Sequence, residues 1–385
     1  MIFEFLIFIC KNFYIDLDII DNLIVRSISI FIVSLFVCNL INSYMIKKIN
    51  KLKIYNKRRK LIKKKVSNIK DVTSIGGILI ILSTILFILI FSDYKNKYIK
   101  IVLFIFFVSS LIGIFDDLFK VIKFSTDGLY PYQKIFFQFL ITIICIIFLI
   151  FVIFESLIKN ILNNEYILNL VNLESRITYP IKINIFLESS YISINIFLFF
   201  LLLLFFFLLT ANSVNLTDGL DGLAIIPVIL INSYFCLYSY FIGHIKYSKK
   251  IFSTFVPEVS EITVLCSSIT GSCISFLLFN SNPAKVFMGD TGSIAMGLEI
   301  CLVSLIINKE ITIFIIGVIF FVESFSVIIQ VIFYIFTKNR YRYGQRIFKI
   351  TPIHHHLEIL GWKETKIVFR FCLFNIIIII LNLCK

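Results

Sequence analysis

The chain has 385 residues, of which 59% are hydrophobic and only 16% are charged. Soluble domains carry about 25% charged residues, so one soluble core could not absorb this apolar excess. Lys and Arg exceed Asp and Glu by 14, but the basic residues lie beside apolar runs, which favours contact with anionic lipid over nucleic acid. The nine cysteines include no CxxC pair, so neither a disulfide framework nor a zinc site is indicated.

Apolar runs of about 20 residues, long enough to cross a hydrocarbon core of about 30 Å as helices, recur along the chain. They predict an all-α polytopic membrane protein, with residues 1–385 forming a single integral membrane domain of about ten transmembrane helices. The ten runs cover roughly residues 23–45, 74–92, 98–115, 135–154, 192–211, 223–243, 262–280, 292–308, 311–336 and 366–383.

Basic residues near the ends of these runs predict the orientation in the membrane. Segment 46–73 is dense in Lys and Arg, so it is expected in the cytoplasm. Counting runs from there places 337–365 in the cytoplasm as well, and that segment is also basic. Both termini then lie outside, together with the polar segment 155–191, where a small hairpin or helix is expected.

The same count gives five inner segments, and nearly every unusual polar cluster lies in or beside one of them. These segments are 46–73, 116–134, 212–222, 281–291 and 337–365. In the second, Asp116 and Asp117 adjoin the end of an apolar run, where a hard cation would offset their mutual repulsion. The alternative is a solvated helix end with Lys120 as a neighbouring charge.

Two further clusters combine amides, carboxylates and glycines. Residues 212–222 contain two Asp-Gly steps, at Asp218 and Asp221, whereas a plain interhelical turn needs only one. Amides beside carboxylates suit recognition of a base or ribose, or support of a metal. In residues 280–293, Asp290 lies between glycines before an apolar run, where a helix start would direct backbone N–H groups at an anion. Phe287 nearby could stack on a base or pack in lipid.

The fourth cluster is a run of three histidines. His354, His355 and His356 are consecutive, so they cannot all face one point on a regular helix, which makes a zinc site from this run alone unfavourable. Contact with phosphate, beside basic residues, is the better interpretation. The chain lacks a Walker A loop, HExxH and GxSxG. Inner-face carboxylates with cations predict metal-assisted phosphoryl transfer, where catalysis is mainly positioning and charge neutralisation.

Five runs of sequence, in order from about residue 70 to the end, resemble the phospho-N-acetylmuramoyl-pentapeptide-transferase family of polyprenyl-phosphate N-acetylhexosamine-1-phosphate transferases. They read GIFDDLFK, NSVNLTDGLDGLA, FNSNPAKVFMGDTGS, ESFSVIIQV and RIFKITPIHHHLEILGWKETKIV. The resemblance implies transfer of phospho-MurNAc-pentapeptide from UDP-MurNAc-pentapeptide to undecaprenyl phosphate, giving lipid I and UMP. It also implies Mg²⁺ as cofactor and a bacterial inner (plasma) membrane location with a cytoplasmic active site.

Site residues follow from the resemblance, position by position. The catalytic positions match Asp116, Asp117, Asp290, Lys120, His354, His355 and His356, with Asp290 as the Mg²⁺ ligand. The substrate-binding positions match Asn212, Asn215, Asp218, Asp221, Asn280, Phe287, Lys134, Lys70 and Ser74. One region departs: the family usually reads Thr-Pro-Thr-Met-Gly-Gly before the second run, whereas residues 72–77 here read Val-Thr-Ser-Ile-Gly-Gly, without the proline.

Two rival functions remain at this point. A sister enzyme that transfers GlcNAc-1-phosphate to the same lipid would share the Asp-Asp and Asp-Gly signals, although the His-His-His-Leu-Glu run favours the muramoyl enzyme. An ion-coupled transporter would place its carboxylates near the middle of the membrane, and here they lie towards one face. The order of bond making, the third residue of the stem peptide and a homodimeric state stay open.

Overall fold

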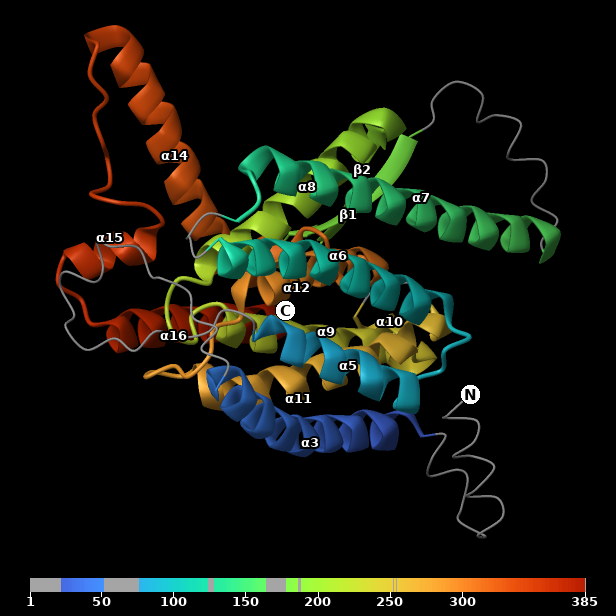
Figure 1. Ribbon diagram of the computed structural model, residues 1–385. Coiled ribbons are helices and arrows are strands. Elements are labelled where there is room, and N and C mark those ends of the chain that lie inside the picture. The colour runs from blue at the N-terminus through green and yellow to red at the C-terminus, as the bar shows by residue number, and fades with distance from the viewer. Residues whose placement is uncertain are drawn as a thin grey trace.

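A computed structural model describes residues 22–51, 76–123, 128–163, 178–185, 188–251, 253 and 255–384 (Figure 1). The longer helices are α3 (Leu23–Lys51), α5 (Gly77–Phe91), α6 (Lys97–Ile122), α7 (Pro131–Asn163), α8 (Ile196–Thr217), α9 (Ile225–Ile242), α11 (Ile262–Asn280), α12 (Gly289–Ile306), α14 (Val318–Tyr341) and α16 (Glu364–Leu383). Shorter elements are α10 (Ile245–Lys250), η3 (Pro257–Glu261), α13 (Thr312–Ile316), α15 (Ile353–Ile359), β1 (Thr178–Ile185) and β2 (Glu188–Asn195).

The ten predicted transmembrane runs match these ten longer helices. Within the described residues, nine helices have the length and apolar composition to cross a membrane. The tenth, α5, is apolar but has only 15 residues, which as a helix is about 22 Å long. The predicted run 311–336 differs in detail, because α13 ends before Gly317 and α14 then continues to Tyr341. The prediction of a helical, polytopic membrane protein is confirmed.

Helices α11 and α12 form the most buried part of the bundle. Small side chains on α11 let its neighbour α3 approach closely, as is usual between membrane helices. Asn42 of α3 donates to Ser275 Oγ at 3.3 Å, and Cys38 lies 3.4 Å from Ser272 Oγ. Helix α12 packs against α6 and α8. The C-terminal ends of α6 and α8 meet the N-terminal end of α12 at one end of the bundle.

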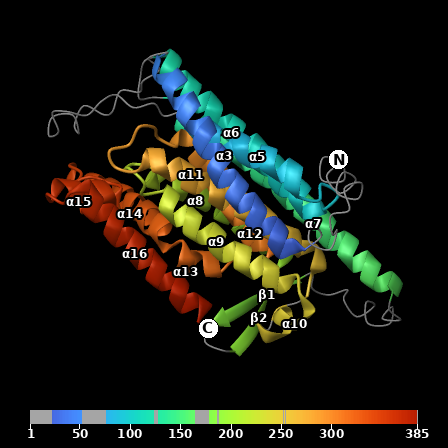
Figure 2. The same ribbon diagram turned by 90° about the horizontal axis from the view of Figure 1, so that it is seen from below.

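The strands form an antiparallel hairpin, the only sheet among the described residues. Thr178 pairs with Asn195 and Ile185 with Glu188. The hairpin overlaps the polar segment 155–191, for which a hairpin or helix was expected. In the bundle it lies, with α10, at the end opposite α15 (Figure 2). The helical class therefore holds for the membrane-spanning part, and the hairpin is a small addition at one end.

Candidate active site

Three carboxylates converge at the ends of two helices. Asp116 and Asp117 lie near the end of α6, and Asp290 lies in the first turn of α12. One oxygen from each lies within 4.8 Å of the others. Asp116 and Asp117 are buried, with exposed fractions of 0% and 1%. Gly113 permits this approach, because a Cβ atom there would overlap the backbone of Asp290 and Thr291.

Hydrogen bonds fix the three carboxylates from different segments. Thr291 donates to Asp117 Oδ2 through its backbone N–H, at 3.0 Å, and through its hydroxyl, at 2.8 Å. The Leu129 N–H donates to Asp116 Oδ1 at 2.7 Å. Asn215 of α8 donates to Asp290 Oδ1 at 2.8 Å. Because each carboxylate has its own donors, the cluster is held in place by the surrounding chain.

Two lysines lie among the carboxylates. Lys120 Nζ is 2.6 Å from Asp116 Oδ2, 3.3 Å from Asp117 Oδ1 and 3.0 Å from Asp290 Oδ2. Lys134, in the first turn of α7, is 3.0 Å from Asp116 Oδ2 and also pairs with Asp290. Two ammonium groups leave one negative charge on the three carboxylates. The oxygen donors suit a hard divalent cation such as Mg²⁺, and the site would then be positive enough for an anionic substrate.

The turn after α8 lies beside this cluster. Asp218 Oδ2 accepts from the Gly289 N–H at 2.9 Å, next to Asp290 in sequence. Burial raises the pKa of Asp218 to about 7, although the hydrogen bond from Gly289 lowers it. Phe287 is half-buried, and its carbonyl accepts from the Gly76 N–H at 3.0 Å. Asn215 and Asp218 therefore border the carboxylates from the α8 side, whereas Phe287 lies just before α12, next to the start of α5.

Three other predicted substrate-binding residues mainly tie segments together. Asp221 accepts from Asn282 Nδ2 at 3.1 Å and from the Ala284 N–H at 3.0 Å. Asn280 accepts from the Gly222 N–H at 3.1 Å and donates to the Val286 carbonyl at 2.8 Å. Asn212 donates to Gln138 Oε1 at 2.9 Å and to the Leu208 carbonyl at 2.7 Å. These bonds shape the loops around the site.

The three histidines point in different directions, as their adjacency predicts. His354 is fully buried, with Nδ1 3.0 Å from Glu323 Oε2. His355 is half-buried, with Nδ1 2.6 Å from Glu358 Oε2. His356 Nδ1 accepts from the Lys349 N–H at 3.2 Å. The predicted site residues Lys70 and Ser74 lie outside the described residues.

Sequence reasoning gave no role to Thr291 or Glu323, two buried polar residues near the site. Thr291 holds Asp117 by two hydrogen bonds, and its place directly after Asp290 was the only signal. Glu323 is a single carboxylate in an apolar run. Inside a membrane helix such a residue is usually paired with another charged or polar group. That partner, His354, is 31 positions away and could not be identified from spacing.

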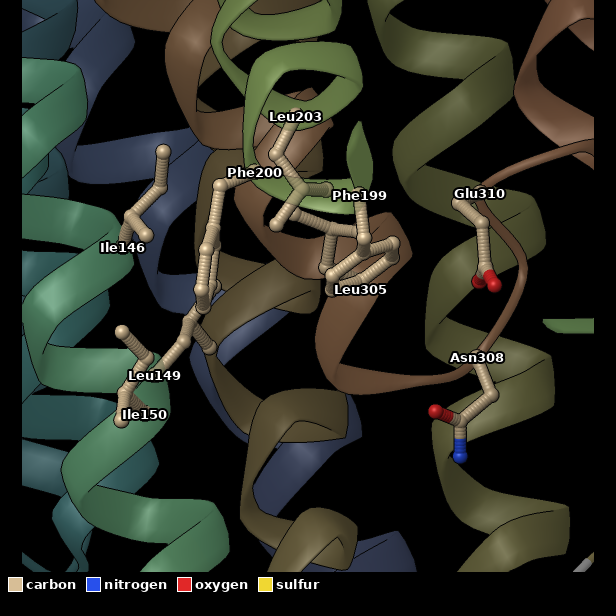
Figure 3. A pocket seen from close by; sticks show the side chains of 9 residues that line it. All are labelled: Ile146, Leu149, Ile150, Phe199, Phe200, Leu203, Leu305, Asn308 and Glu310. Carbon is tan, nitrogen blue, oxygen red and sulfur yellow. The ribbon is translucent and has the colours of Figure 1, made fainter. Parts of the chain in front are cut away.

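An apolar pocket lies between α7, α8 and α12, at the end of these helices far from the carboxylates (Figure 3). Ile146, Leu149 and Ile150 of α7 face Phe199, Phe200 and Leu203 of α8 and Leu305 of α12. Asn308 and Glu310, just after α12, are the polar members of its lining. The pocket is thus separated from the carboxylates by most of the length of α8 and α12, and it brings no chemistry to them.

The bundle and its cluster define a class: a polytopic membrane protein with a carboxylate site, suited to a divalent cation, at one end of its helices. Residues 99–308 match glycosyl transferase family 4. Proteins named phospho-N-acetylmuramoyl-pentapeptide-transferase from Rickettsia felis and Rickettsia canadensis are each 40% identical to the chain over 311 residues, covering 80% of the chain and 78% of each relative. The protein of that name from Rickettsia bellii is 38% identical over the same length.

The chain therefore belongs to glycosyl transferase family 4 and, within it, to the phospho-N-acetylmuramoyl-pentapeptide-transferases. The match over residues 99–308 contains all three carboxylates, both lysines and the turn after α8. The histidine run lies beyond it.

Proposed function

We propose that the chain transfers phospho-MurNAc-pentapeptide from UDP-MurNAc-pentapeptide to undecaprenyl phosphate, forming lipid I and UMP. The observation that carries the proposal is the cluster of Asp116, Asp117 and Asp290 with two lysines, in a chain of this family. In the net reaction, an oxygen of the lipid phosphate becomes bonded to the phosphorus that carries the sugar. The bond from that phosphorus to UMP breaks, and UMP leaves with the electron pair.

Asp116, Asp117 and Asp290 would hold Mg²⁺, which when bound neutralises pyrophosphate charge and polarises phosphoryl oxygens. The ammonium groups of Lys120 and Lys134, which contact these carboxylates, would hold phosphate oxygens beside them. Thr291 orients Asp117 by donating two hydrogen bonds to one of its oxygens. The proposed contribution of this chain is therefore positioning and charge balance, as is typical of phosphoryl transfer.

The two parts of the donor are assigned to different segments. Asn215 and Asp218 would contact uridine, since they border the cluster from the α8 side. Phe287, three positions before Asp290, would stack on the base. Asn212, Asp221 and Asn280 would support that pocket by tying its loops together. His355 and His356, which are less buried than His354, would contact the pyrophosphate or the muramoyl group. Lys70 and Ser74 are proposed as nucleotide contacts from the family motif alone.

The direct test is UMP release by the purified protein in detergent with undecaprenyl phosphate and Mg²⁺. UDP-MurNAc-pentapeptide should be turned over, and UDP-GlcNAc should not. Efficient use of UDP-GlcNAc would instead assign the chain to the sister activity, and a transporter would release no UMP with either donor. His355→Ala should lower kcat/KM for the muramoyl donor while leaving inhibition by UMP nearly unchanged, because only the part beyond uridine is affected.

The active site is proposed to face the cytoplasm of the bacterial inner membrane. The basic residues between α14 and α16 favour this orientation. Cys384, which is exposed just after α16, would then lie outside. In intact cells, a membrane-impermeant thiol reagent should label a variant that keeps only Cys384, and should not label a cysteine-free variant carrying Tyr343→Cys. The reverse labelling would invert the orientation without changing the site.

A further inference from the structure

Glu323 is a buried carboxylate within the membrane-spanning helix α14, and its exposed fraction is 0%. A charged group in that setting is costly unless it is paired. Its neighbour is the first histidine of the run. Glu323 Oε2 lies 3.0 Å from His354 Nδ1 and accepts from the His354 backbone N–H at 3.4 Å. The carboxylate therefore contacts both the ring and the backbone of a single residue.

The opposite side of the His354 ring lies against the turn after α8. A Cβ atom on Gly219 would overlap His354 Nε2, so only glycine lets the ring approach this closely. Gly219 directly follows Asp218, which accepts from the Gly289 N–H beside Asp290. A continuous set of contacts thus runs from Glu323 through His354 to the turn that borders the carboxylate cluster.

The contact with Glu323 also influences which ring nitrogen of His354 carries the proton. Nδ1 and Glu323 Oε2 lie at an ion-pair distance without hydrogen-bond geometry. A carboxylate beside Nδ1 still favours the proton on that nitrogen and restricts the ring orientation. Nε2 then keeps its lone pair on the side of Gly219. His355 and His356 have other partners, Glu358 and the Lys349 N–H, so this arrangement belongs to His354 alone within the run.

We propose that Glu323 is a positioning residue for donor binding. It fixes the His354 ring, and the ring braces the Asp218–Gly219 turn that carries the uridine contacts. This inference rests on the proposed function, because it assigns the braced turn to the nucleotide. The three histidines then have two roles. His354 supports the nucleotide pocket through the Asp218–Gly219 turn, whereas His355 and His356 contact the remainder of the donor.

The histidine ring itself provides a test that does not depend on turnover. The chain has only four histidines, so ¹⁵N-histidine labelling in bilayers gives four pairs of ring signals, which single substitutions can assign. In the neutral form of the His354 ring the proton should lie on Nδ1, and Glu323→Gln should lower the share of that tautomer. An unchanged His354 signal in Glu323→Gln would overturn the proposal, whatever donor the enzyme uses.

Kinetics test the link to the nucleotide pocket. Glu323→Ala should raise KM for the donor and Ki for UMP together, by about 10- to 100-fold, with a smaller effect on kcat. Glu323→Gln, which can still accept from the His354 N–H, should restore part of the affinity. In a His354→Ala background, Glu323→Ala should cause no further loss, because its effect passes through that ring. Additive losses, or an unchanged Ki for UMP, would contradict the proposal.

Glu299 provides a matched control. It too is a fully buried carboxylate in a membrane-spanning helix, and it accepts from Asn232 Nδ2 at 3.4 Å. Glu299→Gln should leave both the His354 signals and Ki for UMP unchanged. Unfolding of every variant can be followed by the fluorescence of Trp362, the chain's only tryptophan. Failure of wild-type protein to release UMP from UDP-MurNAc-pentapeptide would refute the proposed function, while the ring signals would still decide the role of Glu323.

Discussion

Helices α7, α8 and α12 have two ends of opposite character. At one end, Lys134, Asn215 and Asp290 contribute to a charged cluster held by hydrogen bonds and ion pairs. At the other end, the same helices line an apolar pocket whose only polar members are Asn308 and Glu310. Burying charged groups costs desolvation free energy, and a bundle with only a structural role would gain nothing from that cost. The asymmetry supports the proposal that the reaction takes place at the charged end.

The greatest loss of activity is expected at the proposed metal ligands. Asp290→Asn removes one of three carboxylates and leaves a weaker oxygen donor, so we expect kcat in the UMP-release assay to fall by on the order of 10³-fold. The folded state should remain, because the amide oxygen of the new side chain can still accept from Asn215. Near-normal turnover at saturating Mg²⁺, with unchanged thermal stability, would show that this end of the helices is not the catalytic end.

A smaller loss is expected when one cation of the cluster is removed. Lys134→Gln deletes an ammonium that contacts Asp116 and Asp290, so kcat/KM should fall by about 10- to 100-fold. The matched control is Lys123→Gln, at the end of α6, where the exposed ammonium lies over the Phe119 ring. If both variants lose activity equally, total basic charge matters and the geometry of the cluster does not.

The close contact between α6 and the start of α12 at Gly113 can be tested by a change in packing. Gly113→Ala would force α6 away from the start of α12, and overpacking of this kind costs about 1–3 kcal/mol. We expect lower thermal stability in detergent together with at least a tenfold loss of kcat, because the carboxylates belong to both helices. Ser109→Ala, one turn earlier on the same helix, adds no volume and should change neither quantity strongly.

The smallest effect is expected at the apolar end. Burial raises the pKa of the Glu310 carboxyl, so the folded state binds a proton that the unfolded state has lost. Stability therefore falls as the pH rises from the unfolded pKa through the folded one. Glu310→Gln should remove that decline in melting temperature as the pH rises above the usual pKa of a glutamate, while changing kcat less than twofold. A large loss of activity would mean that the two ends are coupled.

Much of this organisation could be predicted from the sequence. Apolar runs of sufficient length predict the membrane helices, and the basic residues beside them predict which helix ends lie on the same side of the membrane. That count alone brought Asp116, Asp117 and Asp290 to one face, although 173 positions separate Asp117 from Asp290. Contacts between helices could not be predicted in the same way. The pairing of Glu323 with His354, and the loop-tying bonds of Asp221 and Asn280, depend on how α11, α14 and α15 pack. Helical periodicity carries no information about that packing.

We propose that three carboxylates from α6 and α12 form a divalent-cation site at the charged end of the bundle. Mn²⁺ reports such a site directly, because its EPR signal changes on binding. Titration of the purified protein in detergent should show one tight site per chain, displaced by Mg²⁺ and lost in both Asp117→Asn and Asp290→Asn, but kept in Glu299→Gln and Glu310→Gln. Tight Mn²⁺ binding that survives in both aspartate variants would contradict the account.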